Sequence, residues 1–528
     1  MKKNSRQFTA PISKAMEAYA GDGALAFHTP GHKQGLGAHP LLKRLITEAG
    51  LRQEVSLMEE LDDLHEPTGC IKEAQELAAE LWGARESLFV INGTTGAIQA
   101  MLVGTLSPGD TVLVPRNVHR SIMGGIILAG AVPIYIQPEI DTRLGIAMGL
   151  SVATVKQAIK EHPEAKALVA VYPTYYGFCC DLQRIGELLH EANMLLLVDE
   201  AHGAHLRFGK DLPKQAIELG ADVAAQSTHK LLGSMTQTSM LHIGSNRVEA
   251  ERIRQAASLL QSTSPNQLLL ASLDIARLQM AQEGAQRVNR AVELAQWLRK
   301  KINEIPGLYC PGKEIWAGQK AGPLVAGGED LADVGAVALD WAKVTVNLAG
   351  LDISGQEAEL LLRHQWKVQC ELSDPENLLF IVSMADTQRE ADRLLQVLQE
   401  LAAKHQRTMA TKTANKDDSG IAEEQGCPGA DNICHMADMP VAVQSMNPRE
   451  AFFAPIRTVA LEKAIGCICG ETIAFYPPGI PVLCPGEEIT EALVEYIRFY
   501  QAKGMRLSGA VDSRLETIRV CQKAGIQD

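Results

Sequence analysis

The sequence predicts an α/β protein whose main domain is built on a mainly parallel β-sheet, with a smaller α/β domain towards the C-terminus. Short apolar runs alternate with amphipathic helical stretches from about residue 87 onward. The 528 residues are 46% hydrophobic and 21% charged, a balance typical of a soluble globular protein with several domains. The longest apolar run, residues 124–136, is interrupted by Gly130 and Pro133 and is too short to cross a bilayer.

Strand-like and helical patterns follow one another regularly in the main domain. The strand-like runs span residues 87–93, 110–117, 132–138, 166–173, 194–203 and 221–230, and the helical stretches span residues 94–106, 119–130, 152–162 and 182–193. Continuous apolar strands separated by helices indicate a sheet that is covered on both faces. In such a sheet we expect the ligand site at the carboxyl ends of the strands.

Changes of pattern along the chain predict five parts. They are an N-terminal arm (1–70), the main domain (71–310), the first part of a small domain (311–405), a flexible linker (406–432) and a C-terminal α/β unit (433–528). Thr387 and Glu390 form a capping-box pattern at the start of an amphipathic helix over residues 387–405. The linker is polar and has no periodicity, which is typical of mobile chain.

Charge and cysteine content exclude some functions. The formal net charge of -13 argues against nucleic-acid binding and permits attraction of small cations. The N-terminal residues carry positive charges without the apolar stretch of a signal peptide, so we expect a cytoplasmic protein. The eleven cysteines have no metal-ligand or redox spacing, and we therefore expect free thiols and no metal.

Polar residues of particular types stand at the predicted strand ends. The segment NGTTG places Thr94 and Thr95 where a helix N-terminus can hold an anion, and His119 lies in the next such loop. Asp199 follows a buried apolar run, and Lys230 ends another, beside Ser227 and His229. Each also fits a structural role, such as a helix cap, a surface histidine or an ion pair.

Together these residues match the requirements of pyridoxal 5′-phosphate. Its aldehyde needs a lysine for a Schiff base, its pyridine nitrogen a carboxylate, and its phosphate a helix N-terminus. Lys230, Asp199 and the NGTTG segment supply these groups in an ordered set. The sequence therefore predicts an enzyme that uses this cofactor.

The sequence resembles the ornithine/lysine/arginine decarboxylase family, whose members are fold-type-I pyridoxal-phosphate enzymes related in architecture to aspartate aminotransferase. The resemblance covers nearly the whole chain and rests on the motifs FHTPGHKQG (27–35), ELDDLHEPTG (60–69), NGTTGA (92–97), PRNVHRS (115–121), VDEAHGAH (198–205), QSTHKLL (226–232), STSP (262–265) and YPPGIPVLCPGE (476–487). It implies the short form of the family, without the N-terminal receiver-like domain of the large forms, and it makes residues 71–310 the cofactor-binding domain and 433–528 the C-terminal decarboxylase domain.

The resemblance also implies roles for individual residues. Lys230 would bond to the cofactor, Asp199 would pair with the pyridinium nitrogen, and His119 would stack on the ring. The phosphate and its surroundings would be held by Thr94, Thr95, Ser227 and His229, with Ala201 under the ring. Active sites of this family lie at dimer interfaces, so Ser262 and Thr263 are expected to contact the neighbouring subunit's phosphate in a homodimer or higher homo-oligomer. His202 stands where relatives often have tryptophan, which leaves its role open.

The expected reaction is decarboxylation of a basic amino acid for polyamine biosynthesis. Arginine to agmatine is the first choice, lysine to cadaverine the second and ornithine to putrescine the third. Asp63 and Glu487 are candidates for binding the cationic substrate side chain, together with His202 as a further substrate contact.

Three alternatives stay open at this point. The first is another fold-type-I reaction such as transamination, because Lys230 and Asp199 would serve it equally well. The second is a non-catalytic cofactor-binding protein. The third is a thiol-based metal or redox protein that would use Cys427, Cys434, His435, Cys467 and Cys469.

Overall fold

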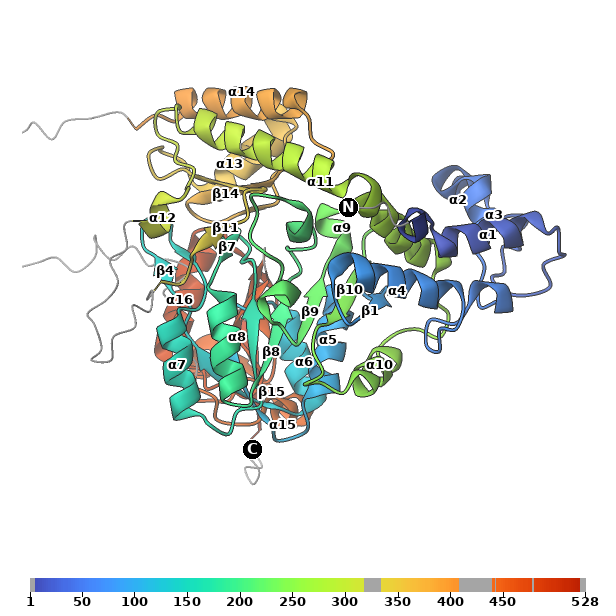
Figure 1. The fold of residues 1–528 in the computed structure, drawn as a ribbon. Helices are drawn as coiled ribbons and strands as arrows, with labels where there is room; N and C mark the ends of the chain where they lie inside the picture. Colours follow the sequence, from blue (N-terminus) through green and yellow to red (C-terminus); the bar gives the residue numbers. More distant parts are fainter. Residues whose placement is uncertain (1–4, 318–333, 408–438, 442, 477–478, 523–528) are drawn as a thin grey trace, which may run out of the picture.

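A seven-stranded sheet forms the centre of the computed structural model, which describes residues 5–317, 334–407, 439–441, 443–476 and 479–522 (Figure 1). In spatial order its strands are β1 (Glu86–Val90), β10 (Ser239–Ile243), β9 (Val223–Gln226), β8 (Leu195–Asp199), β6 (Ala167–Val171), β2 (Thr111–Pro115) and β3 (Val132–Ile136). Strand β10 is antiparallel to both of its neighbours, whereas the pairs from β9 to β3 are parallel. The predicted mainly parallel sheet is confirmed; β10 was not predicted.

Helices cover both faces of this sheet, as the alternation of patterns predicted. One face packs against α5 (Gly93–Thr105), α6 (Arg120–Ala129) and α10 (Ala250–Leu259). The other face packs against α7 (Val152–Glu161) and α8 (Leu182–Glu191), and near β1 against α4 (Cys70–Trp82). Because successive side chains of a strand point to opposite faces, Val112 and Leu113 of β2 belong to the two different cores.

One long helix, α11 (Gln267–Ile302, 36 residues), links the main domain with the small domain. It contacts α4 and α1 (Pro11–Gly21), and along the same helix it contacts α14 (Gln388–Lys404) and strand β12 (Lys343–Asn347) (Figure 1). Among the described residues no helix, α11 included, has both the length and the apolar character that a bilayer crossing requires.

The small domain is an antiparallel sheet covered by α14. Its strands follow the order β12, β14 (Asn377–Ile381), β13 (Leu372–Ser373), and α13 (Gly355–Leu361) packs beside them. The predicted capping box at the start of α14 is confirmed, since Thr387 and Glu390 bond reciprocally to each other's backbone N–H groups. Apolar residues Leu394, Val397, Leu398 and Leu401 bury one face of α14 in the core of this domain.

The C-terminal part adds two further small sheets. Strand β15 (Ile456–Ala460) pairs with β19 (Thr517–Cys521), and β16 (Ile473–Tyr476) lies between β17 (Ile480–Leu483) and β18 (Arg506–Ser508). Helices α15 (Pro448–Phe453) and α16 (Glu491–Ala502) accompany them. Of the predicted linker, residues 408–432 lie outside the described residues, and the five-part division stays a prediction.

Short elements complete the fold. They are α2 (Pro40–Ile46), α3 (Glu48–Gln53), α9 (Thr228–Leu231), α12 (Glu314–Ala317), β4 (Ile140–Asp141), β5 (Ile146–Ala147), β7 (Phe178–Cys179), β11 (Ala338–Leu339), a π-turn (Leu362–Trp366) and the 3-10 turns Ser5–Phe8, Glu59–Leu61, Leu206–Phe208, Ala216–Leu219 and Leu461–Lys463. Helices α2 and α3 belong to an N-terminal arm that projects from the main domain beyond α1 (Figure 1).

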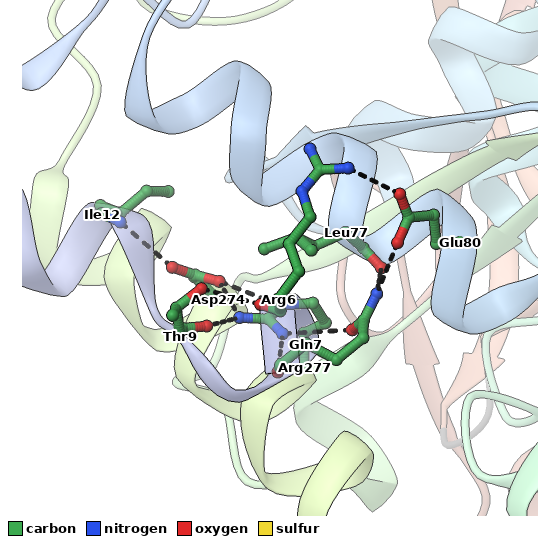
Figure 2. A network of polar contacts seen from close by, with 8 residues as sticks. All are labelled: Arg6, Gln7, Thr9, Ile12, Leu77, Glu80, Asp274 and Arg277. Carbon is green, nitrogen blue, oxygen red and sulfur yellow. Dashed lines mark hydrogen bonds and ion pairs between the residues drawn. The ribbon is translucent and has the colours of Figure 1, made fainter. Parts of the chain in front are cut away.

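A buried arginine fastens the first described residues to α11 (Figure 2). Arg277 pairs with Asp274 at 2.8 Å, and both side chains are fully buried. The guanidinium group also donates to the carbonyl oxygens of Gln7 and Thr9, while Asp274 accepts from the backbone N–H of Ile12. This network fixes the entry of α1 against the main domain.

Candidate active site

The loops that follow β1, β2, β6, β8 and β9 meet in one cavity of about 510 Å³ at the carboxyl ends of the strands. A volume of this size suits a cofactor with a small substrate. Many of the predicted site residues line it, namely Thr94, Thr95, His119, Asp199, Ala201, His202, Ser227, His229 and Lys230. The strand ends bring them together because parallel strands place their carboxyl ends at the same edge of a sheet.

Lys230 lies in α9, the short helical turn directly after β9. Its Nζ is 2.9 Å from Nε2 of His202. Burial lowers the pKa of this amine, and the negative charges of Asp199 and Glu371 partly oppose that effect. A lowered pKa raises the fraction of neutral amine, which is the form that attacks a carbonyl carbon.

Asp199 is the last residue of β8 and is buried. Its Oδ1 accepts a hydrogen bond from the backbone N–H of Ala201 at 3.1 Å, and its Oδ2 bonds to no described residue. Burial raises the pKa of the carboxyl group, whereas the Ala201 N–H and Lys230 lower it. A buried carboxylate oriented in this way can pair with a cationic ring nitrogen.

The N-terminus of α5 also lines the cavity. Gly93 starts the helix with a φ of 67°, a conformation that favours glycine, and its N–H donates to the carbonyl of Gln237. Thr94 is buried, and its hydroxyl bonds with those of Ser227 and Ser239. Free N–H groups at a helix N-terminus, next to hydroxyl groups, are suited to a phosphate.

Two histidines that line the cavity, His119 and His229, each make a hydrogen bond that orients the imidazole ring. Nδ1 of His119 accepts from the backbone N–H of Ser121, and burial together with the charge of Lys230 lowers the pKa of His119 to about 4. Nδ1 of His229 lies 2.8 Å from the carbonyl oxygen of Thr238 and donates to it. Burial lowers the pKa of His229 as well, so both rings are neutral at neutral pH.

The donor set fits pyridoxal 5′-phosphate. The cavity offers the lysine amine, a carboxylate oxygen of Asp199 without a described partner, a neutral aromatic ring at His119 and the anion-binding start of α5. The aldehyde, the ring nitrogen, the ring face and the phosphate of the cofactor therefore each have a chemically matched group in one cavity.

Four predicted site residues do not line this cavity. Ser262 and Thr263 are exposed, and the carbonyl of Ser262 lies 2.9 Å from Nε2 of His65. Their contact with a neighbouring subunit stays a prediction. Asp63 accepts from the backbone N–H of His65 and does not reach the cavity within its own chain.

Glu487 requires a correction. Its carboxylate is fully buried and is occupied by both terminal nitrogens of Arg116 and by the backbone N–H of Cys484. A side chain without exposed surface cannot meet the substrate, so the expectation of a substrate contact at Glu487 is wrong.

Sequence reasoning missed three residues at the site. Glu371 and Tyr175 line the cavity, and the ring of Tyr175 meets that of His202 edge to face with centroids 5.4 Å apart. Lys343 of β12 is fully buried, and its Nζ lies 2.5 Å from Nδ1 of His202. Tyr175 follows the predicted strand 166–173 by two positions, as His119 follows the strand 110–117, so its position after a strand could have pointed to it. Glu371 and Lys343 follow none of the predicted strands and gave no such signal.

Metal chemistry has no support in the described part of the chain. No group of three or more histidine, cysteine, aspartate or glutamate side chains there could hold a metal ion. Cys467 and Cys469 are free thiols, and Cys427, Cys434 and His435 lie outside the described residues.

The fold is that of the fold-type-I pyridoxal-phosphate enzymes. A lysine decarboxylase of Francisella novicida superimposes with a TM-score of 0.80 at 22% identity, over 98% of this chain and 82% of that one. The constitutive lysine decarboxylase of Escherichia coli gives a TM-score of 0.75, also at 22% identity, over 98% of this chain and 82% of that one. At this level of identity the likeness concerns the fold alone.

The chain belongs to the Orn/Lys/Arg decarboxylase family. The model of the family's major domain matches residues 10–390, and the model of its C-terminal domain matches residues 433–520. The arginine decarboxylase of Halalkalibacterium halodurans is 40% identical over 519 residues, which cover 98% of this chain and 99% of that protein. The arginine decarboxylase of Bacillus subtilis is 40% identical over 517 residues, which cover 98% and 99%. The chain is therefore a decarboxylase, and the resemblance drawn from the motifs is confirmed.

Proposed function

We propose that this chain removes the carboxylate of L-arginine as carbon dioxide and releases agmatine, with pyridoxal 5′-phosphate bound in the main cavity. One observation carries the proposal. A lysine, a buried carboxylate and a helix N-terminus line one cavity in a chain that is 40% identical over its length to an arginine decarboxylase. Lysine to cadaverine is the second candidate and ornithine to putrescine the third, and polyamine biosynthesis is the proposed role of each product.

Residues around the cavity would hold the cofactor at several points. Lys230 would bond covalently to its aldehyde carbon, and Asp199 would pair with its ring nitrogen. The N-terminal turn of α5 would bind the phosphate. The remaining contacts would come from His119 and Ala201 at the ring and from Thr94, Thr95, Ser227 and His229 near the phosphate. When bound, the cofactor supplies a ring that accepts the electron pair left when carbon dioxide departs.

Asp199 and Lys230 would manage the protons of the reaction. A buried carboxylate stabilises a neighbouring cation, so Asp199 would keep the ring nitrogen protonated. Lys230, once displaced by the amine of the substrate, would return a proton from Nζ to the α-carbon. His229 is a weaker candidate for this transfer because its one ring hydrogen is engaged by the Thr238 carbonyl.

Glu371 supports a cationic substrate. Among the described residues that line the cavity, Asp199 and Glu371 alone carry carboxylates, and Asp199 is assigned to the cofactor. Glu371 is exposed and precedes β13 at the small-domain side of the cavity. We infer that Glu371 pairs with the guanidinium group of arginine, because charge-assisted bonds to a carboxylate match its planar donors.

We infer a homodimer or a higher homo-oligomer with shared active sites. Ser262 and Thr263 are exposed and do not line the cavity of their own chain. Large apolar side chains of the N-terminal arm are exposed as well, including Leu25, Phe27, Leu36 and Leu45. Exposed apolar surface of this kind is typical of an interface. The free cysteines among the described residues support a reducing, cytoplasmic location.

A substrate panel tests the proposal. Purified protein with added cofactor is incubated with arginine, lysine or ornithine, and carbon dioxide and amine are quantified. We expect the highest kcat/KM for arginine, with no turnover by a Lys230→Ala control. Formation of a keto acid instead of carbon dioxide would contradict decarboxylation. A coloured protein without turnover on any of the three would favour a binding protein.

A further inference from the structure

Lys343 is a buried lysine that the proposed reaction does not use. It lies on β12, has no exposed surface, and makes no ion pair with a described residue. The polar partner of its Nζ among the described residues is Nδ1 of His202, at 2.5 Å. The stem of Lys343 passes Gly177, where a Cβ atom would lie only 2.8 Å from the Lys343 Cβ. The fold thus makes room for a side chain that costs free energy to bury.

His202 connects this lysine with Lys230. Its Nε2 lies 2.9 Å from Nζ of Lys230, while its Nδ1 faces Lys343, so the imidazole bridges two amines. A neutral imidazole donates at one nitrogen and accepts at the other. The amine that receives its hydrogen must be neutral, since an ammonium group has no lone pair. Around a neutral His202, one of the two lysines is therefore a neutral amine.

The charged groups around the bridge allow the two lysines to hold one proton between them. Burial holds the pKa of His202 well below its ordinary value and lowers the pKa of Lys343 to about 8, and it also lowers the pKa of Lys230. The titratable groups that face this cluster are Asp199, Glu371 and Asp340, which favour charged amines, and His119 and His205, which disfavour a charged imidazole. Tyr175, whose ring contacts that of His202, stays a neutral phenol because burial raises its pKa. Oδ1 of Asp340 accepts hydrogen bonds from His205 and from the backbone N–H of Ala342, whereas its Oδ2 is buried without a hydrogen-bond partner among the described residues. Asp340 therefore contributes negative charge that favours an ammonium group at Lys343.

We propose that His202 transfers a proton between Lys230 and Lys343, so that Lys343 stores the proton that Lys230 gives up before it bonds to a carbonyl carbon. In the forward direction Nζ of Lys230 gives a proton to Nε2 of His202, and Nδ1 of His202 gives its proton to Nζ of Lys343. The imidazole stays neutral, its hydrogen moves from Nδ1 to Nε2, and the total charge is unchanged. The reverse transfer restores the ammonium form of Lys230 when it must donate a proton. The proposal rests on the role of Lys230 in the proposed function.

The pKa of Lys230 in the cofactor-free protein directly tests whether Lys343 stores the proton of Lys230. Brief acetic anhydride pulses at several pH values, followed by mass spectrometry, give the fraction of Lys230 that is neutral. In Lys343→Met the proton has no second amine, so we expect the pKa of Lys230 to rise by at least about one unit. Lys404→Met removes a lysine that lies over Trp366 in the same domain and should leave it unchanged. An unchanged Lys230 pKa in folded Lys343→Met would overturn the proposal.

Lys343→Arg separates proton storage from positive charge. Arginine stays protonated, so it keeps the pKa of Lys230 low by repulsion and cannot accept a proton. We expect Lys343→Arg to lower kcat by at least about tenfold with little change in KM, since the transfer through His202 is blocked. Wild-type turnover by Lys343→Arg would mean that only the positive charge at position 343 matters. It would overturn the proposal that Lys343 stores a proton.

His202→Gln tests the bridge without changing β12. A glutamine amide can donate and accept, but it cannot exchange these roles as an imidazole does. In this background we expect Lys343→Met to shift the pKa of Lys230 by less than about 0.3 unit. If Lys343→Met shifted the pKa of Lys230 equally in the His202→Gln background, direct repulsion between the two lysines would explain the shift. Proton transfer through His202 would then be rejected. Borohydride trapping in wild-type holoenzyme keeps the two proposals distinguishable, because failure to label Lys230 would reject the proposed function whatever the cofactor-free titration gives.

Discussion

Arg116 and Glu487 are separated by 371 positions in the chain and form a buried two-point ion pair, with Nη1–Oε1 at 2.7 Å and Nη2–Oε2 at 3.0 Å. Arg116 directly follows β2, and Glu487 follows β17 of the C-terminal part. Arg116 also donates to the carbonyl of Val482. The pair therefore ties the C-terminal part to the loop that carries His119.

Glu487→Gln should destabilise the protein. The substitution leaves the charge of Arg116 buried without its partner, and breaking such a pair costs about 3–5 kcal/mol. Urea unfolding of Glu487→Gln measures this loss, with the neighbouring, partly exposed Glu488→Gln as the control. If Glu487→Gln had normal stability and a raised KM for arginine, Glu487 would instead be a substrate-binding residue.

The sequence predicts the part of the candidate active site that lies at the strand ends, because Asp199 and Lys230 stand where continuous apolar runs end. Such positions become the carboxyl edge of a parallel sheet, and the cavity forms there. Lys343 gives no comparable signal, since a lysine within the run KVTVN is read as solvent-facing until the packing of β12 is known. Its burial depends on His202 of another domain, 141 positions away.

Contacts between residues distant in the chain also explain why the sequence misassigned Glu487 and did not predict strand β10. Glu487 resembles surface charge in the sequence because its partner Arg116 is distant in the chain. Strand β10 carries His242, whose burial depends on Ser87 and Gln226 of the flanking strands. Its antiparallel direction follows from pairing with β1 and β9, which local pattern does not encode.

Lys230→Ala should abolish both turnover and covalent attachment of the cofactor, while the fold is retained. The side chain lies at the cavity wall, so its removal leaves no void in the apolar core. Borohydride reduction of the holoprotein and peptide mapping should label Lys230 in the wild type and no peptide in the variant. Labelling of another lysine would contradict the assignment.

Asp199→Asn should lower kcat by several orders of magnitude with a smaller effect on cofactor affinity. The amide keeps the shape and the bond to the Ala201 N–H but cannot stabilise a protonated ring nitrogen. Steady-state kinetics and a fluorescence titration with the cofactor measure the two effects. If Asp199→Asn kept the wild-type kcat, Asp199 would not be the carboxylate that pairs with the ring nitrogen. Glu371→Gln, which changes the other carboxylate of the cavity, is the comparison variant.

Arg277→Met should loosen the first turns of the chain without altering the cavity. It removes the donor to the Gln7 and Thr9 carbonyls and leaves Asp274 buried without its cation. Hydrogen exchange of the backbone amides in residues 5–21 should increase. Arg6→Ala, which breaks exposed ion pairs with Glu76 and Glu80, should change it little.

His119→Phe tests whether a flat neutral ring is sufficient at the cavity. The pKa of His119 is about 4 in the folded protein, below its ordinary value of 6.5, so the unfolded chain binds more protons between these values. Stability of the wild type therefore rises with pH through this window and is complete above the ordinary value. Phenylalanine has no such titration, and its lost bond to the Ser121 N–H is independent of pH.

The stability difference between wild type and His119→Phe should consequently shift by about 2 kcal/mol in favour of the wild type when the pH rises from about 5 to about 7. Urea unfolding of the cofactor-free proteins at both pH values measures the shift. Cofactor affinity should stay close to the wild-type value in His119→Phe and fall in His119→Ala, because stacking needs the ring rather than its charge. A pH-independent stability difference would mean that His119 titrates normally in the folded protein, and the cavity would then hold a charged ring in mildly acidic solution.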